Sequence, residues 1–210
     1  MSPIRLSGLA LILGGILLAV HLFTHPGGEL AKYALEPLWV PSHAIGAVAY
    51  LLIPLGLIGL YARQSSQMGW LGLVALVLSF VGLTLSAGAS LFLSVVVVPF
   101  LGARGSDWLD PPSGALYVTT AFQIAVGISA AAGLLGMLLL AVATLRARVL
   151  PSLGAWLIVG TVPLAVVALV LVFFVGTSQQ GLIQAAVGAV LGLGVAVWGW
   201  ALWSEKALPA

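Results

Sequence analysis

Six long apolar segments, separated by short polar stretches, constrain what this chain can fold into. They run over residues 4–25, 42–62, 70–100, 115–145, 153–175 and 182–203. A transmembrane helix needs about 20 predominantly apolar residues, and every segment reaches that length. Backbone groups in lipid must find hydrogen-bond partners within their own segment, so we expect each segment to be an α-helix.

The sequence therefore predicts an all-α fold, a polytopic bundle of six transmembrane helices that forms one transmembrane domain over residues 1–210. Composition supports this prediction, because 62% of the residues are hydrophobic and only 6% are charged. Soluble domains carry roughly 25% charged residues. Segments 70–100 and 115–145 are longer than one crossing needs, so we expect a long third–fourth helix hairpin that tilts or projects beyond the membrane.

The basic residues fall mainly on one side of the predicted bundle. Five of the seven lie at the termini or in the second and fourth loops: Arg5, Arg63, Arg146, Arg148 and Lys206. Only Lys32 and Arg104 fall on the opposite side. Because an excess of Lys and Arg marks the cytoplasmic side, this distribution predicts a multi-pass protein of the cell (inner) membrane with both termini in the cytoplasm (N-in/C-in).

Several classes of function are disfavoured by residues that the sequence lacks. The helix interiors contain no Asp, Glu, Lys or Arg, which argues against a proton pump, a retinal protein or a voltage sensor. The chain has no cysteine, so thiol chemistry is excluded. No nucleophile or phosphate-binding motif occurs, so we predict no catalytic residue and expect the chain not to be an enzyme. The dispersed basic residues form no patch for nucleic acid.

Small residues recur at four-residue intervals in three of the segments. They are Gly82, Ser86, Ser90 and Ser94 in the third, Ser129 and Gly133 in the fourth, and Gly188, Gly192 and Ala196 in the sixth. Close contact between small residues drives helix association in lipid. The pattern predicts packing seams within the bundle, with a homo-oligomer contact as the alternative.

The three histidines are the candidate site residues. His21 and His25 are four positions apart and share a helix face, and His43 begins the next, antiparallel helix, so all three are expected at the outer membrane interface. Three imidazoles with Glu29 or Glu36 could bind zinc or copper. Alternatively, His21 and His43 could be the axial ligands of one haem b. Interfacial histidines also occur without any ligand, because the ring is apolar and its tip polar.

One stretch of sequence carries a resemblance. His25-Pro26, the run from Trp39 to His43, and the run from Gly56 to Arg63 resemble uncharacterised bacterial six-helix integral membrane proteins, classed as domains of unknown function. The resemblance covers about the first third of the chain. It implies the six-helix fold but no activity, and it assigns no functional residue.

Three functions remain open on the sequence. The first is a non-enzymatic membrane protein, either an accessory subunit of a larger complex or a binder of a lipophilic ligand. Its partners would be the lipid bilayer and other membrane subunits or a second copy of itself. The alternative is a haem- or metal-binding redox protein that uses the outer-face histidines. The third is a small-solute transporter with a site near the helix-kinking residues Pro54 and Pro163.

Overall fold

The regular structure of the chain is helical throughout the residues that can be described. A computed structural model describes residues 2–25, 36–97, 99–100, 115–175 and 180–204. Its elements are the helices α1 (Pro3–Thr24), α3 (Trp39–Ala89), α5 (Ala115–Ala147), α6 (Leu153–Val175) and α7 (Gln180–Ser204), and the π-helix η1 (Ser90–Val97). These ranges contain no strand, so the predicted all-α class is confirmed.

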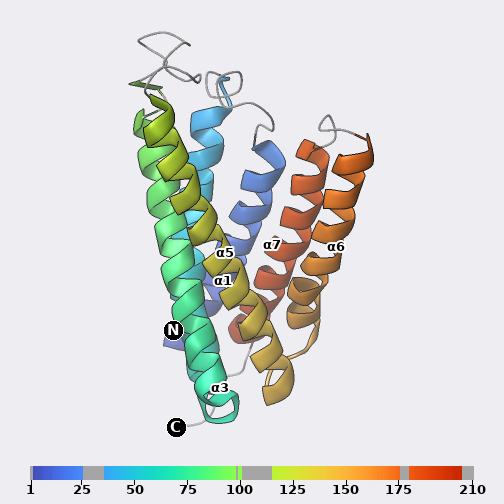
Figure 1. The fold of residues 1–210 in the computed structure, drawn as a ribbon. Coiled ribbons are helices and arrows are strands. Elements are labelled where there is room, and N and C mark those ends of the chain that lie inside the picture. The colour runs from blue at the N-terminus through green and yellow to red at the C-terminus, as the bar shows by residue number, and fades with distance from the viewer. Residues whose placement is uncertain (1, 26–35, 98, 101–114, 176–179, 205–210) are drawn as a thin grey trace.

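The described part of the chain has five α-helices, whereas the sequence analysis counted six helical segments. The difference arises because residues 63–68, expected as a loop, continue the helix. Segments 42–62 and 70–100 thereby join in α3, whose only break is at Gly69, with φ 57° and ψ −154°. Figure 1 shows α3 as two arms that run in opposite directions from this turn. Glycine tolerates such a backbone because it lacks a Cβ.

Four of the described helical stretches are long and apolar enough to cross a membrane. They are Pro3–Thr24, Trp39–Phe92, Ile124–Ala147 and Ala185–Ser204. The described apolar stretch of α6, Leu153–Val167, is shorter. Large apolar side chains also face outward on these helices, and Trp70 is 76% exposed. Apolar helices with an apolar exterior are features of a membrane protein.

The helices pack in a defined order around the core. α1 contacts α7 and the first arm of α3, α5 contacts the second arm of α3, and α6 contacts α7 and α5. Figure 1 shows the second arm of α3 beside α5 over most of their lengths. The fully buried core includes Leu11, Leu57, Leu140 and Trp198.

Small residues allow two of these contacts to be close. A Cβ on Gly82 would lie 2.6 Å from the Cα of Gly133 and 2.7 Å from the carbonyl oxygen of Ser129. A Cβ on Gly15 would lie 2.8 Å from the backbone nitrogen of Ala196. The backbones of α3 and α5, and of α1 and α7, therefore touch at these points. The predicted seams at these positions are confirmed as contacts within one chain.

Candidate functional site

The structure brings the three predicted histidines together where α1 ends and α3 begins. The ring centroids of His21 and His25 are 5.3 Å apart, those of His21 and His43 5.6 Å, and those of His25 and His43 4.7 Å. His21 lies in the last turn of α1, His25 directly follows that helix, and His43 lies in the first turns of α3. We call these three residues the histidine cluster.

Backbone carbonyls orient two of the three rings. Nδ1 of His21 lies 2.9 Å from the carbonyl oxygen of Ser42, and Nδ1 of His43 lies 2.8 Å from that of Trp39. A carbonyl oxygen only accepts hydrogen bonds, so each Nδ1 is the donor. In a neutral imidazole with its proton on Nδ1, the other nitrogen, Nε2, keeps its lone pair. On each ring Nε2 is therefore the nitrogen that can accept a hydrogen bond.

Hydroxyl groups join the two helices beside the cluster. Oγ of Ser42 donates to the carbonyl oxygen of His21 at 3.2 Å, and Oγ1 of Thr24 donates to Oγ of Ser42 at 3.1 Å. Oγ of Ser42 is also 3.2 Å from Nδ1 of His21. Side-chain hydrogen bonds thus join the end of α1 to the start of α3, in addition to packing. They fix the positions of His21 and His43 relative to each other.

The cluster is enclosed by neighbouring rings and backbone. His21 is 3% exposed and His43 7% exposed. The ring of His21 lies against α3, where a Cβ on Gly46 would be 2.7 Å from its Cγ. The Trp39 ring lies 4.2 Å from that of His43, and the Tyr50 ring 5.8 Å from that of His21. A desolvated group of imidazoles results.

Trp39 contributes a buried polar atom to this region. The side chain is 5% exposed, and its Nε1–H finds no hydrogen-bond acceptor among the residues that the structure describes. Buried N–H groups are normally paired. The sequence analysis did not place Trp39, Ser42 or Tyr50 at the site. The signal that could have found Trp39 is its spacing, four residues before His43 on the same helix face.

The observed arrangement does not hold a metal ion as it stands. Within the described ranges, no group of three or more His, Asp or Glu side chains has donor atoms placed to bind one. Of the two carboxylates expected to help, Glu36 is exposed, and Glu29 lies outside the described residues.

The cluster does not fit a haem held between His21 and His43. Their rings are 5.6 Å apart at 67°, and the His25 ring lies within 5.3 Å of both. The Trp39 ring also packs against His43, with the two ring centroids 4.2 Å apart at 37°. A porphyrin between the two rings would have to displace these side chains, so the expectation of a bis-histidine haem is not supported by this geometry.

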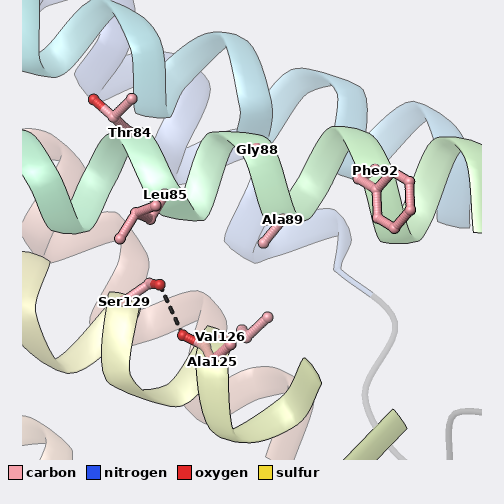
Figure 2. Close-up of a pocket in the computed structure, with 8 residues that line it drawn as sticks. All are labelled: Thr84, Leu85, Gly88, Ala89, Phe92, Ala125, Val126 and Ser129. Atoms are coloured by element: carbon pink, nitrogen blue, oxygen red, sulfur yellow. Dashed lines mark hydrogen bonds between the residues drawn. The ribbon is translucent and has the colours of Figure 1, made fainter. Parts of the chain in front are cut away.

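A second candidate site is a groove between α3 and α5, of about 340 Å³. Figure 2 shows Leu85 and Ala89 extending from α3 toward α5. The lining residues are all uncharged: Thr84, Leu85, Gly88, Ala89, Phe92, Ala125, Val126 and Ser129. Oγ of Ser129 donates to the carbonyl oxygen of Ala125 at 2.7 Å, so this hydroxyl is already paired. The groove is apolar and open at one side.

The groove forms because two helices that touch at one level separate at the next. Gly82 meets the backbone of Gly133, whereas a Cβ on Gly88, less than two turns further along α3, would meet nothing within 4 Å. The separation continues toward Phe92 in η1. π-Helical turns occur often at functional sites. The sequence analysis did not predict this groove.

The two kink positions considered for a transport site lie in different surroundings. Pro54 is buried in the first arm of α3, whereas Pro163 is exposed on α6. The side chains of Gln123 and Gln184, two polar residues within α5 and α7, lie outside what the structure describes.

No protein family, curated protein or solved structure matches this chain. The resemblance to uncharacterised bacterial six-helix membrane proteins therefore stays a prediction.

Proposed function

We propose that this chain is a non-enzymatic, multi-pass protein of the cell membrane that binds a lipophilic ligand in the groove between α3 and α5. The proposal includes six crossings with both termini in the cytoplasm. Four apolar helical stretches support it, together with the break at Gly69, which divides α3 into two antiparallel arms. With α6 as a further crossing, the count is six. The five basic residues on one side favour the orientation.

The groove is the observation that carries the function. It lies between helices of membrane-spanning length, has no charged lining residue and has a paired hydroxyl at Ser129. An apolar occupant fits best, because the lining side chains carry no charge and offer only the hydroxyls of Thr84 and Ser129 as polar groups, and a buried polar group without a partner is costly. Lipid tails are as apolar as leucine, so selectivity comes from shape and van der Waals contact rather than from the hydrophobic effect.

Photo-crosslinking in proteoliposomes tests this function. A lipid with a photoreactive group on its acyl chain is expected to label peptides that contain residues 84–92 and 125–129. Gly88→Leu fills the groove and should abolish this labelling. Gly127→Leu is the matched control, since Gly127 also borders open space but does not line the groove. Equal labelling of both variants, or labelling spread evenly over all helices, would contradict the proposal.

A separate measurement tests the partners of the chain. We propose the bilayer as the first partner, with other membrane subunits or a second copy of the chain as further ones. Native mass spectrometry of protein extracted from its own membranes should reveal a retained subunit as an added mass. A monomer that carries only lipid would favour the ligand binder over the accessory subunit.

A further inference from the structure

We propose that the groove between α3 and α5 binds a single acyl chain of a lipid from one leaflet, the leaflet opposite the turn at Gly69. In the proposed orientation of the chain this is the outer leaflet of the cell membrane. The inference rests on the proposed lipophilic-ligand function, and it adds the class of the ligand and the direction from which the ligand enters. It is carried by the depth of the groove in the membrane, which two helices define.

The end of the bundle that contains the Gly69 turn marks one boundary of the hydrocarbon core. Trp70 directly follows the turn and is exposed to the surroundings of the bundle, and tryptophan is enriched where membrane and water meet. Arg146, in the last turn of α5, is also exposed. The exposed side chains between Trp70 and Thr84 are all apolar, namely Leu73, Val74, Val77, Phe80 and Val81. The hydrocarbon core therefore begins close to Trp70.

The second arm of α3 places the groove beyond the middle of the membrane. Thr84, the lining residue of α3 nearest the turn, follows Gly69 by 15 residues. At a rise of about 1.5 Å per residue, it lies about 22 Å from the turn along the helix axis. The hydrocarbon core is about 30 Å thick, so its midplane lies about 15 Å from either boundary. A tilt of about 40°, at the upper end for membrane helices, would reduce that depth of Thr84 only to about 17 Å.

α5 gives the same depth for the groove. It touches the second arm of α3 where Gly82 meets Gly133. These residues are 13 positions from Gly69 and 14 positions from Ala147, respectively, so the turn and the end of α5 lie at about the same level. Ser129 precedes Ala147 by 18 residues, which is about 27 Å of helix. Both helices therefore place the groove in the half of the membrane farther from the Gly69 turn.

The size of the groove suits one acyl chain. Its lining residues on α3 and η1 run from Thr84 to Phe92, a length of about 12 Å along the axis. One leaflet of the hydrocarbon core is about 15 Å deep, so a chain can lie along the groove without leaving its leaflet. The volume of about 340 Å³ is at the lower end of the roughly 300–1,000 Å³ of ligand pockets. Leu85 and Phe92 are exposed, so the groove opens on a face that meets lipid.

A lipid of this leaflet has only one direction in the groove. Its headgroup stays at the surface far from the Gly69 turn, so its chain must enter past Phe92 and end near Thr84. Figure 2 shows Thr84 and Ser129 toward one end of the groove and Phe92 toward the other. The part of the chain near the headgroup should therefore contact Phe92 and Ala125, and its terminal part should contact Thr84 and Ser129. A lipid of the opposite leaflet could reach only the Thr84 end, and only with its terminal part.

Two photoreactive phosphatidylcholines test this direction in proteoliposomes of phosphatidylcholine that contain the full chain. They differ only in the position of one diazirine, which lies near the ester in the first lipid and near the terminal methyl group in the second. Mass spectrometry of the peptides should find the first lipid on residues 89–92 and 125, and the second on residues 84–85 and 129. The result does not depend on how the protein is oriented in the vesicles, because the positions are compared within the protein.

Two substitutions at opposite ends of the groove make a matched pair. Thr84→Phe fills the end where the chain terminates, so it should abolish labelling by the second lipid and leave labelling by the first. Ala125→Phe fills the end where the chain enters, so it should abolish labelling by both lipids. Thr84 and Ala125 are both exposed, so neither substitution places a larger side chain in the core of the bundle.

The possible failures of the two proposals are distinguishable. Labelling of residues 84–85 by the second lipid, without labelling of residues 89–92 by the first, would overturn the choice of leaflet and leave a lipophilic ligand in the groove. Labelling of the groove by neither lipid would overturn this inference together with the proposed function. A second copy of the chain seated in the groove would give that last result, because it would exclude both lipids.

Discussion

Arg5 and Trp203, 198 positions apart in the chain, join the start of α1 to the end of α7. Nε of Arg5 donates to the carbonyl oxygen of Trp203 at 3.0 Å, and the guanidinium carbon lies 5.1 Å from the centroid of the Trp203 ring. The carbonyl belongs to the last turn of α7, where a cation is favourable. The start of α1 and the end of α7 therefore lie on the same side of the bundle.

Removal of this contact should destabilise the protein. We expect Arg5→Ala to lower the free energy of unfolding by about 1 kcal/mol, since it removes one hydrogen bond from a charged donor and one cation–π contact. Arg5→Lys should recover only part of the loss, because an ammonium does not reproduce the planar guanidinium. Thermal unfolding in detergent measures both. Arg146→Ala, at an exposed position, should change stability little, and an equal loss there would contradict the prediction.

The turn within α3 should depend on glycine. The φ and ψ values of Gly69 fall in a region that is essentially restricted to glycine. We expect Gly69→Ala to lower the free energy of unfolding by about 1–3 kcal/mol. Nothing lies within 4 Å of the added Cβ, so the loss would come from the backbone alone.

Gly160→Ala is the matched control for the turn. Gly160 also borders open space, but it lies inside the helix α6. Alanine is favoured over glycine within a helix by about 1 kcal/mol, so this variant should be neutral or slightly more stable. If the two substitutions changed the unfolding midpoint equally, the backbone conformation of Gly69 would not be what stabilises the turn.

Much of the fold could be predicted, because the length of an apolar segment can be read directly from the local sequence. The helical class followed from the segments, and the meeting of His21, His25 and His43 followed from antiparallel neighbours. The continuation of α3 could not be predicted in the same way. Residues 63–67 are polar and suited an inner loop. In the structure they continue the helix, and the chain turns at Gly69 instead.

The details of the sites depend on packing that no pattern encodes. Ser42 orients His21 only because α1 and α3 meet in one register, and a shift of one residue would give His21 another neighbour. The groove depends on the angle at which α3 and α5 separate beyond Gly82. Such angles result from many contacts together. The sequence around Gly88 and Ala125 therefore gave no indication that a groove forms there.

The contact at Gly82 should be intolerant of a side chain, whereas Gly88 should accept one. A Cβ at Gly82 would meet the backbone of α5, which can yield only if the helices separate. We expect Gly82→Ala to lower the free energy of unfolding by about 1–3 kcal/mol. Gly88→Ala should have no such effect, since its surroundings are open. Thermal unfolding of both variants checks this, and an equal loss at the two positions would contradict the separation of α3 and α5.

The proposed topology can be tested with single cysteines, because the chain has none of its own. Ser2, Glu36, Ser66 and Ser204 are all exposed. We expect Ser2→Cys, Ser66→Cys and Ser204→Cys to react with a membrane-impermeant maleimide only after the cytoplasmic side is opened. Glu36→Cys should react in intact cells. All four positions lie near helix ends or turns, so labelling reports which side of the membrane each end occupies.

Each pair of labels tests a separate part of the topology. Ser2 and Ser204 flank the whole bundle, and they share a side only if the number of crossings is even. Ser66 lies just before the Gly69 turn, and Glu36 precedes α3, so opposite sides for these two would mean that the first arm of α3 crosses the membrane. Reaction of Ser2→Cys and Ser204→Cys from opposite sides would contradict six crossings, and it would separate the helix ends that Arg5 and Trp203 join.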